Sequence, residues 1–478
     1  MIALYVSLGA VLIIILLILI RAFLFRPNTD TVATDDGVSF SSDIAAKTLS
    51  EMIKCRTVSN IDPALEDEAE FSRFESLLKS LFPTVYEKCS VIDVHRRAIL
   101  IKWQGKSADL PTVLMAHYDV VFADNNGWKH HPFSGNISDG CVWGRGSIDT
   151  KITLNAILCA AEELIKQNFT PARDIYMAFG GNEEIGGNGA PSIVDWFIEN
   201  NVTPGIVLDE GGAVVDKVFP GVNSPCALIG IAEKGMLNVR YSVSGIGGHS
   251  SAPSPESPVG ILSRACRRVE KRPFKLRFTP PARRMLDTVA RHSSFGYRLI
   301  FANLWLFTPI INLITRKNGG ELGALLRTTV AFTQMRGSEG MNVIPPYAEM
   351  VSNHRIIPGE TVTSVVSRIK KTVADERVKI DVIYGMDPSR ISKTDGEGWE
   401  RLTRVAKNTW DGAVVSPYLM LACSDSRHWG KISDAVYRFS PLYLTAEERA
   451  SIHAHNERIP TDKVVTAVEF YTRFILES

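Results

Sequence analysis

The sequence predicts an α/β protein with a smaller α+β unit inserted into it and an apolar helix in front of it. Short apolar runs alternate with amphipathic stretches from about residue 43, which is the pattern of a sheet covered by helices. Between residues 233 and 353, strands that alternate apolar and polar residues indicate a half-exposed antiparallel sheet. A chain of 478 residues is also too long for one ordinary core, so we expect two folded units.

The N-terminal segment predicts a membrane anchor. Residues 1–20 contain no charged side chain, and residues 11–20 are almost entirely Ile and Leu. Twenty helical residues span about 30 Å, the thickness of the hydrocarbon core of a bilayer. A cleavable signal peptide is the rival interpretation, but it needs a basic start, a shorter apolar core and a small-residue cleavage site, which are lacking here. We therefore expect a retained single-pass anchor.

Two features bear on the side of the membrane that carries the body. Arg21 and Arg26 follow the apolar run, and the positive-inside rule then favours a cytoplasmic body, although two charges carry little weight. The sequons at Asn136, Asn168 and Asn201 are glycosylation acceptors only in a eukaryotic lumen. The sequence leaves the side of the membrane open.

These patterns divide the chain into five segments. They are the transmembrane anchor (1–25), a polar linker (26–42), the first part of the main domain (43–232), the inserted domain (233–353) and the second part of the main domain (354–478). Within the insertion, residues 299–314 are unusually apolar and are interrupted by Pro309, so they are too short and broken for a second span. Such a run is either a buried helix or a surface that meets lipid or an acyl chain.

Charge and motif content exclude several classes of function. The formal net charge is +1, and no basic run is interleaved with aromatic residues, so we expect no nucleic-acid partner. The seven cysteines include no CxxC pair, which argues against a cysteine zinc site and against a dithiol redox site. The sequence also lacks a Gly-x-Ser-x-Gly elbow, a His-Glu-x-x-His helix and a phosphate-binding Gly-x-x-x-x-Gly-Lys loop.

Acidic and histidine residues follow several of the predicted apolar strands or precede a predicted helix. These residues are His117, Asp119, Asp149, Glu183, Glu184 and Asp209. Because the carboxyl ends of strands in an open α/β sheet form the crevice where ligands bind, three strands would deliver these side chains to one edge. One imidazole with several carboxylates suits zinc or a similar divalent ion. Asp119 lies two residues from His117 along the same strand and could orient its ring.

Each of these signals also has an ordinary structural explanation. A His-x-Asp triplet is often just a hydrogen-bonded pair, and Glu183-Glu184 could be a solvated turn. Asp149 could be a helix N-cap, and Asp209 before two nearby glycines could belong to a plain turn. The functional interpretation rests on their arrangement at successive strand ends rather than on any one residue.

A set of motifs resembles a known family. The strings MAHYDVV, WGRGSIDTK, GGNEEIGG, LDEGG, GGHSS, NVIPPYAEMVSNHRI, SDSRHW and IHAHNE are similar to those of the co-catalytic zinc amidohydrolases. That family includes aminoacylase, carboxypeptidase S, acetylornithine deacetylase and succinyl-diaminopimelate desuccinylase. The resemblance extends from about residue 48 to the C-terminus and is nearest to carboxypeptidase S and the N-acyl-amino-acid hydrolase/synthases. It implies a zinc-peptidase catalytic domain with an inserted lid and dimerisation domain.

The resemblance also implies a metal-ligand set. His117 and Asp209 would hold one zinc ion, Glu184 and His453 the other, and Asp149 would bridge the two; cobalt or manganese could replace zinc. Glu183 would be the general base and Asp119 the residue that orients His117. The family's spacing places the last ligand four residues before Glu457, which selects His453 over the alternative, His455.

The inserted domain acquires roles from the same resemblance. His249 matches a histidine that reaches the active site of the partner subunit in a homodimer and stabilises the oxyanion; otherwise it is a turn histidine. Asn342 and Arg355 match lid residues that grip the substrate carboxylate, for which a planar guanidinium is suited. Arg427 could assist, and the strands around Arg355 could instead leave it on a solvated face.

The sequence thus predicts a membrane-tethered zinc metallopeptidase or amidohydrolase. It would cleave the amide bond next to a free carboxylate, either in small peptides or in N-acyl amino acids. The alternative is a catalytically inactive, membrane-displayed binding module on the same fold. The complete set of presumed ligands and the presumed base argue against that alternative.

Overall fold

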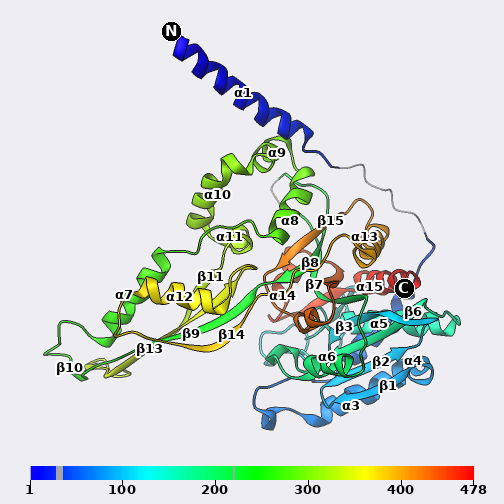
Figure 1. Ribbon diagram of the computed structural model, residues 1–478. Coiled ribbons are helices and arrows are strands. Elements are labelled where there is room, and N and C mark those ends of the chain that lie inside the picture. The colour runs from blue at the N-terminus through cyan, green and yellow to red at the C-terminus, as the bar shows by residue number, and fades with distance from the viewer. Residues whose placement is uncertain (1, 28–35, 219–220) are drawn as a thin grey trace.

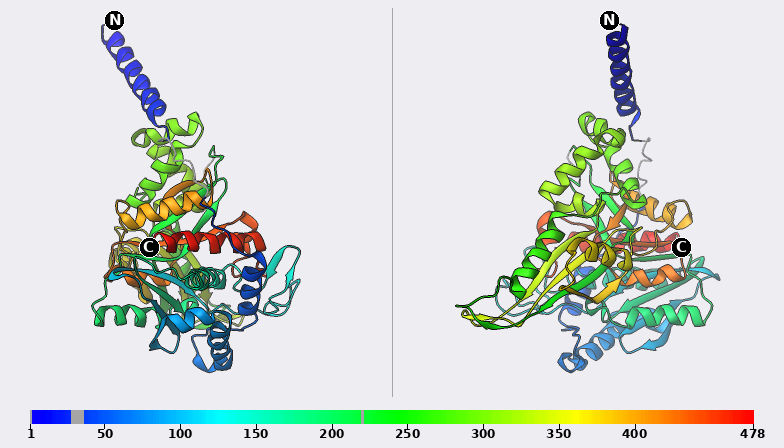
Figure 2. Two further views of the ribbon diagram at one scale, coloured as in Figure 1. Left: turned by 90° about the vertical axis from the view of Figure 1, so that its right-hand side faces the viewer. Right: turned by 60° about the vertical axis from the view of Figure 1, so that its left-hand side comes forward.

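The computed structural model describes residues 2–27, 36–218 and 221–478. Figures 1 and 2 show a body built around two sheets, with helix α1 (Ile2–Leu24) projecting from it. Residues 28–35, about half of the predicted linker, lie outside the described residues. The predicted α/β architecture, with a mixed central sheet flanked by helices, is confirmed.

The central sheet has eight strands, and the four in its middle are parallel. Its order is β1 (Ser90–His95), β2 (Ala98–Trp103), β6 (Arg173–Gly180), β3 (Ser107–His117), β7 (Ile206–Val215), β16 (Val436–Tyr443), β8 (Cys226–Glu233) and β15 (Val414–Met420). Strands β6, β3, β7 and β16 run parallel, whereas β1, β2 and β8 add antiparallel pairs. The parallel strands therefore end at one edge, which is where the sequence places its acids.

Strand β3 shows why its sequence is a continuous apolar run. Its alternate residues belong to two different clusters, with Leu114 and Ala116 on one face and Val113 and Met115 on the other. Because helices cover both faces, neither set can be polar. Helices α2 (Ser42–Ile53), α5 (Lys151–Lys166) and α15 (Thr461–Leu476) pack together on the first face, and α6 (Gly189–Glu199) covers the second.

Further helices, turns and a small sheet complete the main domain. They are α3 (Glu68–Leu81), α4 (Pro83–Lys88), α13 (Glu397–Thr409), α14 (Ala446–Ser451), the 3-10 turns η1 (Pro63–Leu65), η2 (Glu183–Ile185) and η3 (Asp425–Lys431), and a small sheet of β17 (Arg458–Pro460), β5 (Cys141–Trp143) and β4 (Ile137–Ser138). The small sheet pairs a C-terminal strand with the segment that leads to Asp149.

The second sheet is antiparallel and has its own core. Its order is β11 (Thr329–Arg336), β13 (Tyr347–Ile356), β9 (Gly235–Ser244) and β14 (Lys379–Met386). Every second residue of β13 is buried, as the sequence alternation predicts. The buried face packs on α7 (Pro258–Lys271) and α12 (Val362–Val373). At one end, β10 (Gly248–His249) pairs with β12 (Val343–Ile344), and Figure 1 shows β10 at the outer tip.

The second sheet continues beyond the predicted boundary at residue 353. That boundary falls inside β13, and β14 pairs with β9 along seven residues of register from Lys379 to Met386. The propensity pattern could not show this, because only the pairing assigns β14 to one sheet or the other. We propose that the inserted unit extends to about residue 386.

The apolar run at 299–314 forms two helices. Helix α9 (Phe295–Ala302) and helix α10 (Leu304–Asn318) meet at Asn303 with a bend of 103°. The break falls at Asn303, and Pro309 lies inside α10. These helices, together with α8 (Pro280–Arg291) and α11 (Gly320–Leu326), lie between the second sheet and the base of α1 (Figure 1). Among the described residues, α1 alone is a single helix long and apolar enough to cross a membrane.

Candidate metal centre

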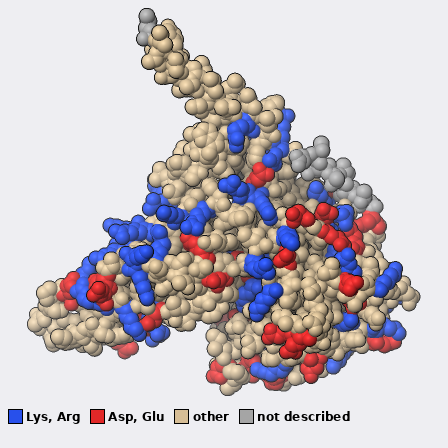
Figure 3. Space-filling view, in the orientation of Figure 1, with Lys and Arg blue, Asp and Glu red and all other residues tan. Residues whose placement is uncertain are grey.

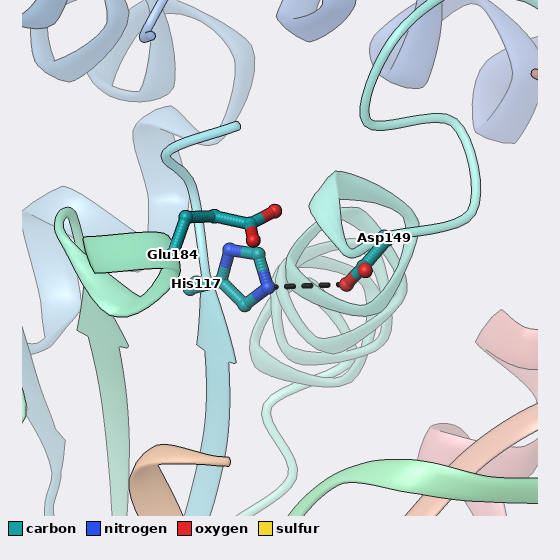
Figure 4. A group of neighbouring side chains, drawn as sticks. All are labelled: His117, Asp149 and Glu184. Atoms are coloured by element: carbon teal, nitrogen blue, oxygen red, sulfur yellow. Dashed lines mark hydrogen bonds and ion pairs between the residues drawn. The ribbon is translucent and has the colours of Figure 1, made fainter. Parts of the chain in front are cut away.

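Two histidines and one further acid come together around Asp149. The Nε2 atom of His117, at the end of β3, lies 3.1 Å from Oδ1 of Asp149 (Figure 4). Asp149 precedes α5, and its second oxygen, Oδ2, lies 3.0 Å from Nε2 of His453. Glu184 Oε1 lies 3.2 Å from the same Nε2 atom. Asp149 therefore presents one oxygen to each histidine, as a carboxylate that bridges two cations would.

The fifth predicted ligand comes from the neighbouring strand. Asp209 lies on β7, which pairs in parallel with β3, and it is 1 % exposed. Its Oδ2 accepts a hydrogen bond from the backbone N–H of Ser426 at 2.9 Å. Its Oδ1 is buried and has no hydrogen-bond partner among the described residues. A buried carboxylate oxygen without a partner is costly, and a bound cation would satisfy it.

The arrangement fits divalent ions. One ligand atom each from His117, Asp149 and Glu184 lies within 4.8 Å of the others. Imidazole nitrogen and carboxylate oxygen are the ligands of catalytic zinc sites. Despite its burial, Asp119 and Asp149 raise the pKa of His117 well above its ordinary value. Hydrogen bonds that the His453 ring donates to Asp149 and Glu184 raise the pKa of His453 to about 10. The carboxylates thus favour positive charge on the rings of both His117 and His453.

Asp119 binds the backbone of Glu183 and Glu184 and does not only orient His117. Its Oδ1 accepts from the backbone N–H of Glu183 at 3.0 Å, and its Oδ2 from that of Glu184 at 3.1 Å. The Ser59 hydroxyl donates to the same Oδ2 at 2.7 Å. The ring Nδ1 of His117 is nearer to the Asp119 carbonyl oxygen, at 3.0 Å, than to its carboxylate, at 3.5 Å. Asp119 therefore connects β3 to the η2 turn that carries both glutamates.

Buried acids that the sequence reasoning missed surround this cluster. Glu210 and Asp425 are both buried close to Asp209. Burial together with the charge of Asp209 raises the pKa of Glu210 well above its ordinary value and that of Asp425 to about 7. Burial likewise raises the pKa of Glu183. Glu210 and Asp425 belong to the motifs LDEGG and SDSRHW, but nothing in the sequence shows that these two acids are buried beside Asp209.

Glu457 anchors the loop that carries Asp149. Its buried Oε1 accepts from the backbone N–H groups of Gly146, Ile148 and Asp149 at 3.1, 2.8 and 3.3 Å. Its Oε2 accepts from Nη1 of Arg145 at 2.7 Å. Because His453 is only four residues earlier in the chain, this one carboxylate connects the segments of two ligands. The motif IHAHNE marked the residue, but only the fold shows its partners.

A cavity of about 800 Å³ joins the cluster to the second sheet. It is lined by His117, Asp149, Glu183, Glu184 and His453 of the cluster, and also by Met236, Asn238, Arg355, Tyr384 and Arg427. Among the described residues, neither arginine lies within 4.0 Å of an acidic side chain; Arg355 Nη1 contacts the Cys423 sulfur at 3.6 Å. Two guanidinium groups and the acids of the cluster thus line the same cavity.

Three predicted residues lie elsewhere. His455 is exposed, with its Nε2 3.7 Å from Asp124, outside the cluster. His249 and Asn342 are exposed beside each other at the tip of the second sheet, where Ser250 N–H donates to the Asn342 carbonyl at 3.1 Å. The structure therefore does not bring Asn342 to the cavity that Arg355 lines within the same chain.

Comparison with known proteins assigns the class. Residues 113–477 match the model of Peptidase family M20/M25/M40, and the chain belongs to this family of metal-dependent hydrolases. It is 36% identical over 480 residues to a probable carboxypeptidase S-like 2 of Dictyostelium discoideum, covering 97% of this chain and 91% of that one. It is 34% identical over 432 residues to the N-fatty-acyl-amino acid synthase/hydrolase PM20D1 of Bos taurus, covering 88% and 85%.

Solved structures share the fold. The M20 family metallo-carboxypeptidase Sso-CP2 of Sulfolobus solfataricus superposes with a TM-score of 0.66 at 18% identity, over 90% of this chain and 98% of that one. YXEP of Bacillus subtilis, a dinuclear metal-binding peptidase from the M20 family, superposes with a TM-score of 0.55 at 11% identity, over 91% and 98%. The predicted family resemblance is thus confirmed, and the protein is an enzyme.

The choice between the two C-terminal histidines is testable. We expect His453→Ala to lose one of two bound metal ions, because its ring lies between Asp149 and Glu184, whereas His455→Ala should keep both. Metal content per chain after dialysis, measured by inductively coupled plasma mass spectrometry, distinguishes them. Loss of an ion from the His455 variant alone would reverse the assignment.

The Glu457 network gives a second prediction. Glu457→Ala removes the acceptor of three backbone N–H groups around Asp149, so we expect metal affinity to fall about 10- to 100-fold, as for other residues that orient ligands. Competition with a chelator measures it. Glu447→Ala, at an exposed neighbouring acid, is the matched control. Unchanged affinity in a folded Glu457 variant would contradict the positioning role.

Proposed function

We propose that the chain is a co-catalytic zinc hydrolase that cleaves the amide bond next to a free carboxylate. The main support is the bridged geometry of Asp149, which lies 3.1 Å from one histidine and 3.0 Å from the other. His117 and Asp209 would hold one ion, and Glu184 and His453 the other. The dinuclear metal-binding peptidase with the same fold supports this stoichiometry. Cobalt or manganese could replace zinc at such a site.

When bound, the two ions lower the pKa of water and polarise the scissile carbonyl. Glu183 is the general base in this proposal. It takes a proton from the attacking water and delivers it to the leaving nitrogen. Asp119 fixes the backbone of Glu183 and of Glu184 together, so the base and a metal ligand keep one relative position. Glu183 is half-buried at the cavity wall, which limits the access of bulk water to its carboxylate.

The substrate's carboxylate would bind to Arg355, with help from Arg427. Both guanidiniums line the cavity and lack an acidic partner in the described part of the chain, which leaves their hydrogen-bond donors available to an anion. The apolar lining residues Met236, Met420 and Leu444 suit the side chain or acyl group of a small peptide or an N-acyl amino acid. The names of the two curated relatives, a carboxypeptidase S-like protein and an N-fatty-acyl-amino acid synthase/hydrolase, agree with these substrate classes.

A homodimer and a membrane anchor complete the proposal. His249 and Asn342 lie at an exposed tip, so they could reach substrate only in another chain's site. We therefore assign both to the active site of a partner subunit, where His249 would stabilise the oxyanion. Helix α1 would remain as a single-pass anchor. Its apolar side chains are nearly all exposed, which suits lipid surroundings.

If Glu183 is the general base, its substitution should lower activity without releasing the metal ions. Glu183→Gln should lower kcat by about 10²- to 10⁴-fold, the usual contribution of a positioned acid–base group, while both metal ions stay bound. Steady-state kinetics and metal analysis of the same preparation test this. Glu199→Gln, on the exposed part of α6, should behave as wild type. Near-normal turnover by the Glu183→Gln variant would show that another group is the base.

If Arg355 binds the substrate's carboxylate as a clamp, its loss should lower activity only on substrates that have a free carboxylate. For substrates with a free carboxylate, Arg355→Gln should lower kcat/KM about 30-fold or more, because losing a paired buried charge costs about 2 kcal/mol or more. Substrates whose carboxylate is amidated should have a low kcat/KM with both the wild type and the variant, and the substitution should change this value little. Arg240→Gln, on the exposed side of β9, is the control. Equal wild-type turnover of free and amidated substrates would contradict the clamp.

A further inference from the structure

Helix α10 has an apolar face that the core does not use. Its outer face consists of Trp305, Leu306, Ile310, Leu313 and Ile314, which are 61, 40, 52, 69 and 50% exposed. The last four have the i, i+4, i+7, i+8 spacing of one helical stripe. The opposite side already packs on the body through Ile311 and Thr315, which are 8 and 5% exposed. A contiguous exposed apolar patch of this kind marks an interaction site.

The α10 outer face begins at the base of α1. The Arg21 guanidinium, near the end of α1, donates to the Ala302 carbonyl at 3.1 and 2.8 Å. Next to it, the Asn303 side-chain amide donates to the Ile18 carbonyl of α1 at 3.2 Å. The junction of α9 and α10 is thus fixed to the last turns of the apolar helix. If α1 crosses a membrane, the start of α10 lies where α1 leaves it.

The geometry favours a position in the membrane interface over a second span. Helices α9 and α10 are bent by 103°, and α10 has only 15 residues, fewer than the roughly 20 needed to cross. Figure 1 shows α10 leading across the direction of α1 rather than along it. A helix with an apolar outer face, a tryptophan and basic residues at its end is suited to the boundary between headgroups and acyl chains.

Basic side chains border the α10 outer face. Arg316 and Lys317 end α10, and Arg283 and Arg284 are exposed on α8. A cavity of about 500 Å³ at the base of α1 is lined by Arg21, Arg283 and Arg291 together with Phe25, Phe301 and Trp305. Asp287 also lines it and pairs with Arg291 at 3.0 Å. Figure 3 shows Lys and Arg gathered around the base of α1, where anionic headgroups would lie.

Two other occupants fit less well. A second copy of the chain related by a two-fold axis would bring like basic borders near each other, which opposes association. An acyl group of the substrate would have to reach from the active-site cavity, and none of the five residues of the α10 outer face lines that cavity.

We propose that the α10 outer face lies in the interface of the membrane that anchors α1, with anionic phospholipid headgroups against the surrounding arginines. This inference rests on the proposed retention of α1 as an anchor. It gives the body a second attachment, at the junction of α9 and α10, so the body is held in one orientation on the membrane instead of only being tethered to it.

Tryptophan fluorescence of the full chain tests the proposal. Trp305 is the exposed tryptophan among the eight, all of which are described, and α1 contains none. The chain is reconstituted in phosphatidylcholine–phosphatidylserine vesicles whose acyl chains carry bromine near the headgroup. We expect quenching that is mostly lost in Trp305→Phe and clearly reduced in an Ile310→Glu/Leu313→Glu variant. Val91→Glu, an exposed apolar residue of β1 that is 53% exposed, should leave quenching unchanged.

Each outcome bears on a different part of the proposal. A chain that floats with the vesicles while Trp305 stays unquenched contradicts interfacial docking and leaves the anchor standing. A chain that does not float with vesicles contradicts both. Equal quenching in vesicles of phosphatidylcholine alone overturns the role assigned to the arginines. Trp305 shielded in a chain–chain contact, detected as cross-linked dimers without quenching, assigns the face to a second copy.

Discussion

The carboxylate of Asp149 is the contact on which the site depends. One of its oxygens faces His117, which ends a strand in the first part of the main domain, and the other faces His453, near the C-terminus. These two histidines are far apart in the sequence, so their meeting requires the complete α/β core. Glu457 strengthens the junction, because the same C-terminal loop that supplies His453 also supplies the acceptor for the Asp149 loop.

The charge distribution follows from this junction. Acids are gathered at the strand ends, several of them buried, and burial raises the pKa of Glu183, Glu210 and Asp425. Such a cluster is unfavourable by itself and becomes favourable around cations. The arginines of the same cavity are contributed by β13 and η3. One ligand with a polarisable carbonyl and a free carboxylate could therefore contact the metal-binding cluster and the arginines at once.

The sequence was most informative where an apolar strand is followed by residues that can bind a metal ion. Strands such as β3 are buried on both faces, so their apolar runs and the polar residues that end them were visible without a structure. The separation of Asn342 from Arg355 within one chain was not visible, because the tip formed by β10 and β12 depends on sheet geometry rather than on local pattern. The partners of Asp119 and Glu457 are backbone N–H groups, which carry no sequence signature. The outer face of α10 was likewise ambiguous, since periodicity does not tell which apolar stripe is covered.

The most direct measurement is anomalous scattering at the zinc edge from crystals of the metal-loaded chain. The account predicts two ions per chain, one between His117, Asp209 and Asp149 and the other between Asp149, Glu184 and His453. A single ion, or two ions that do not share Asp149, would contradict the bridged centre.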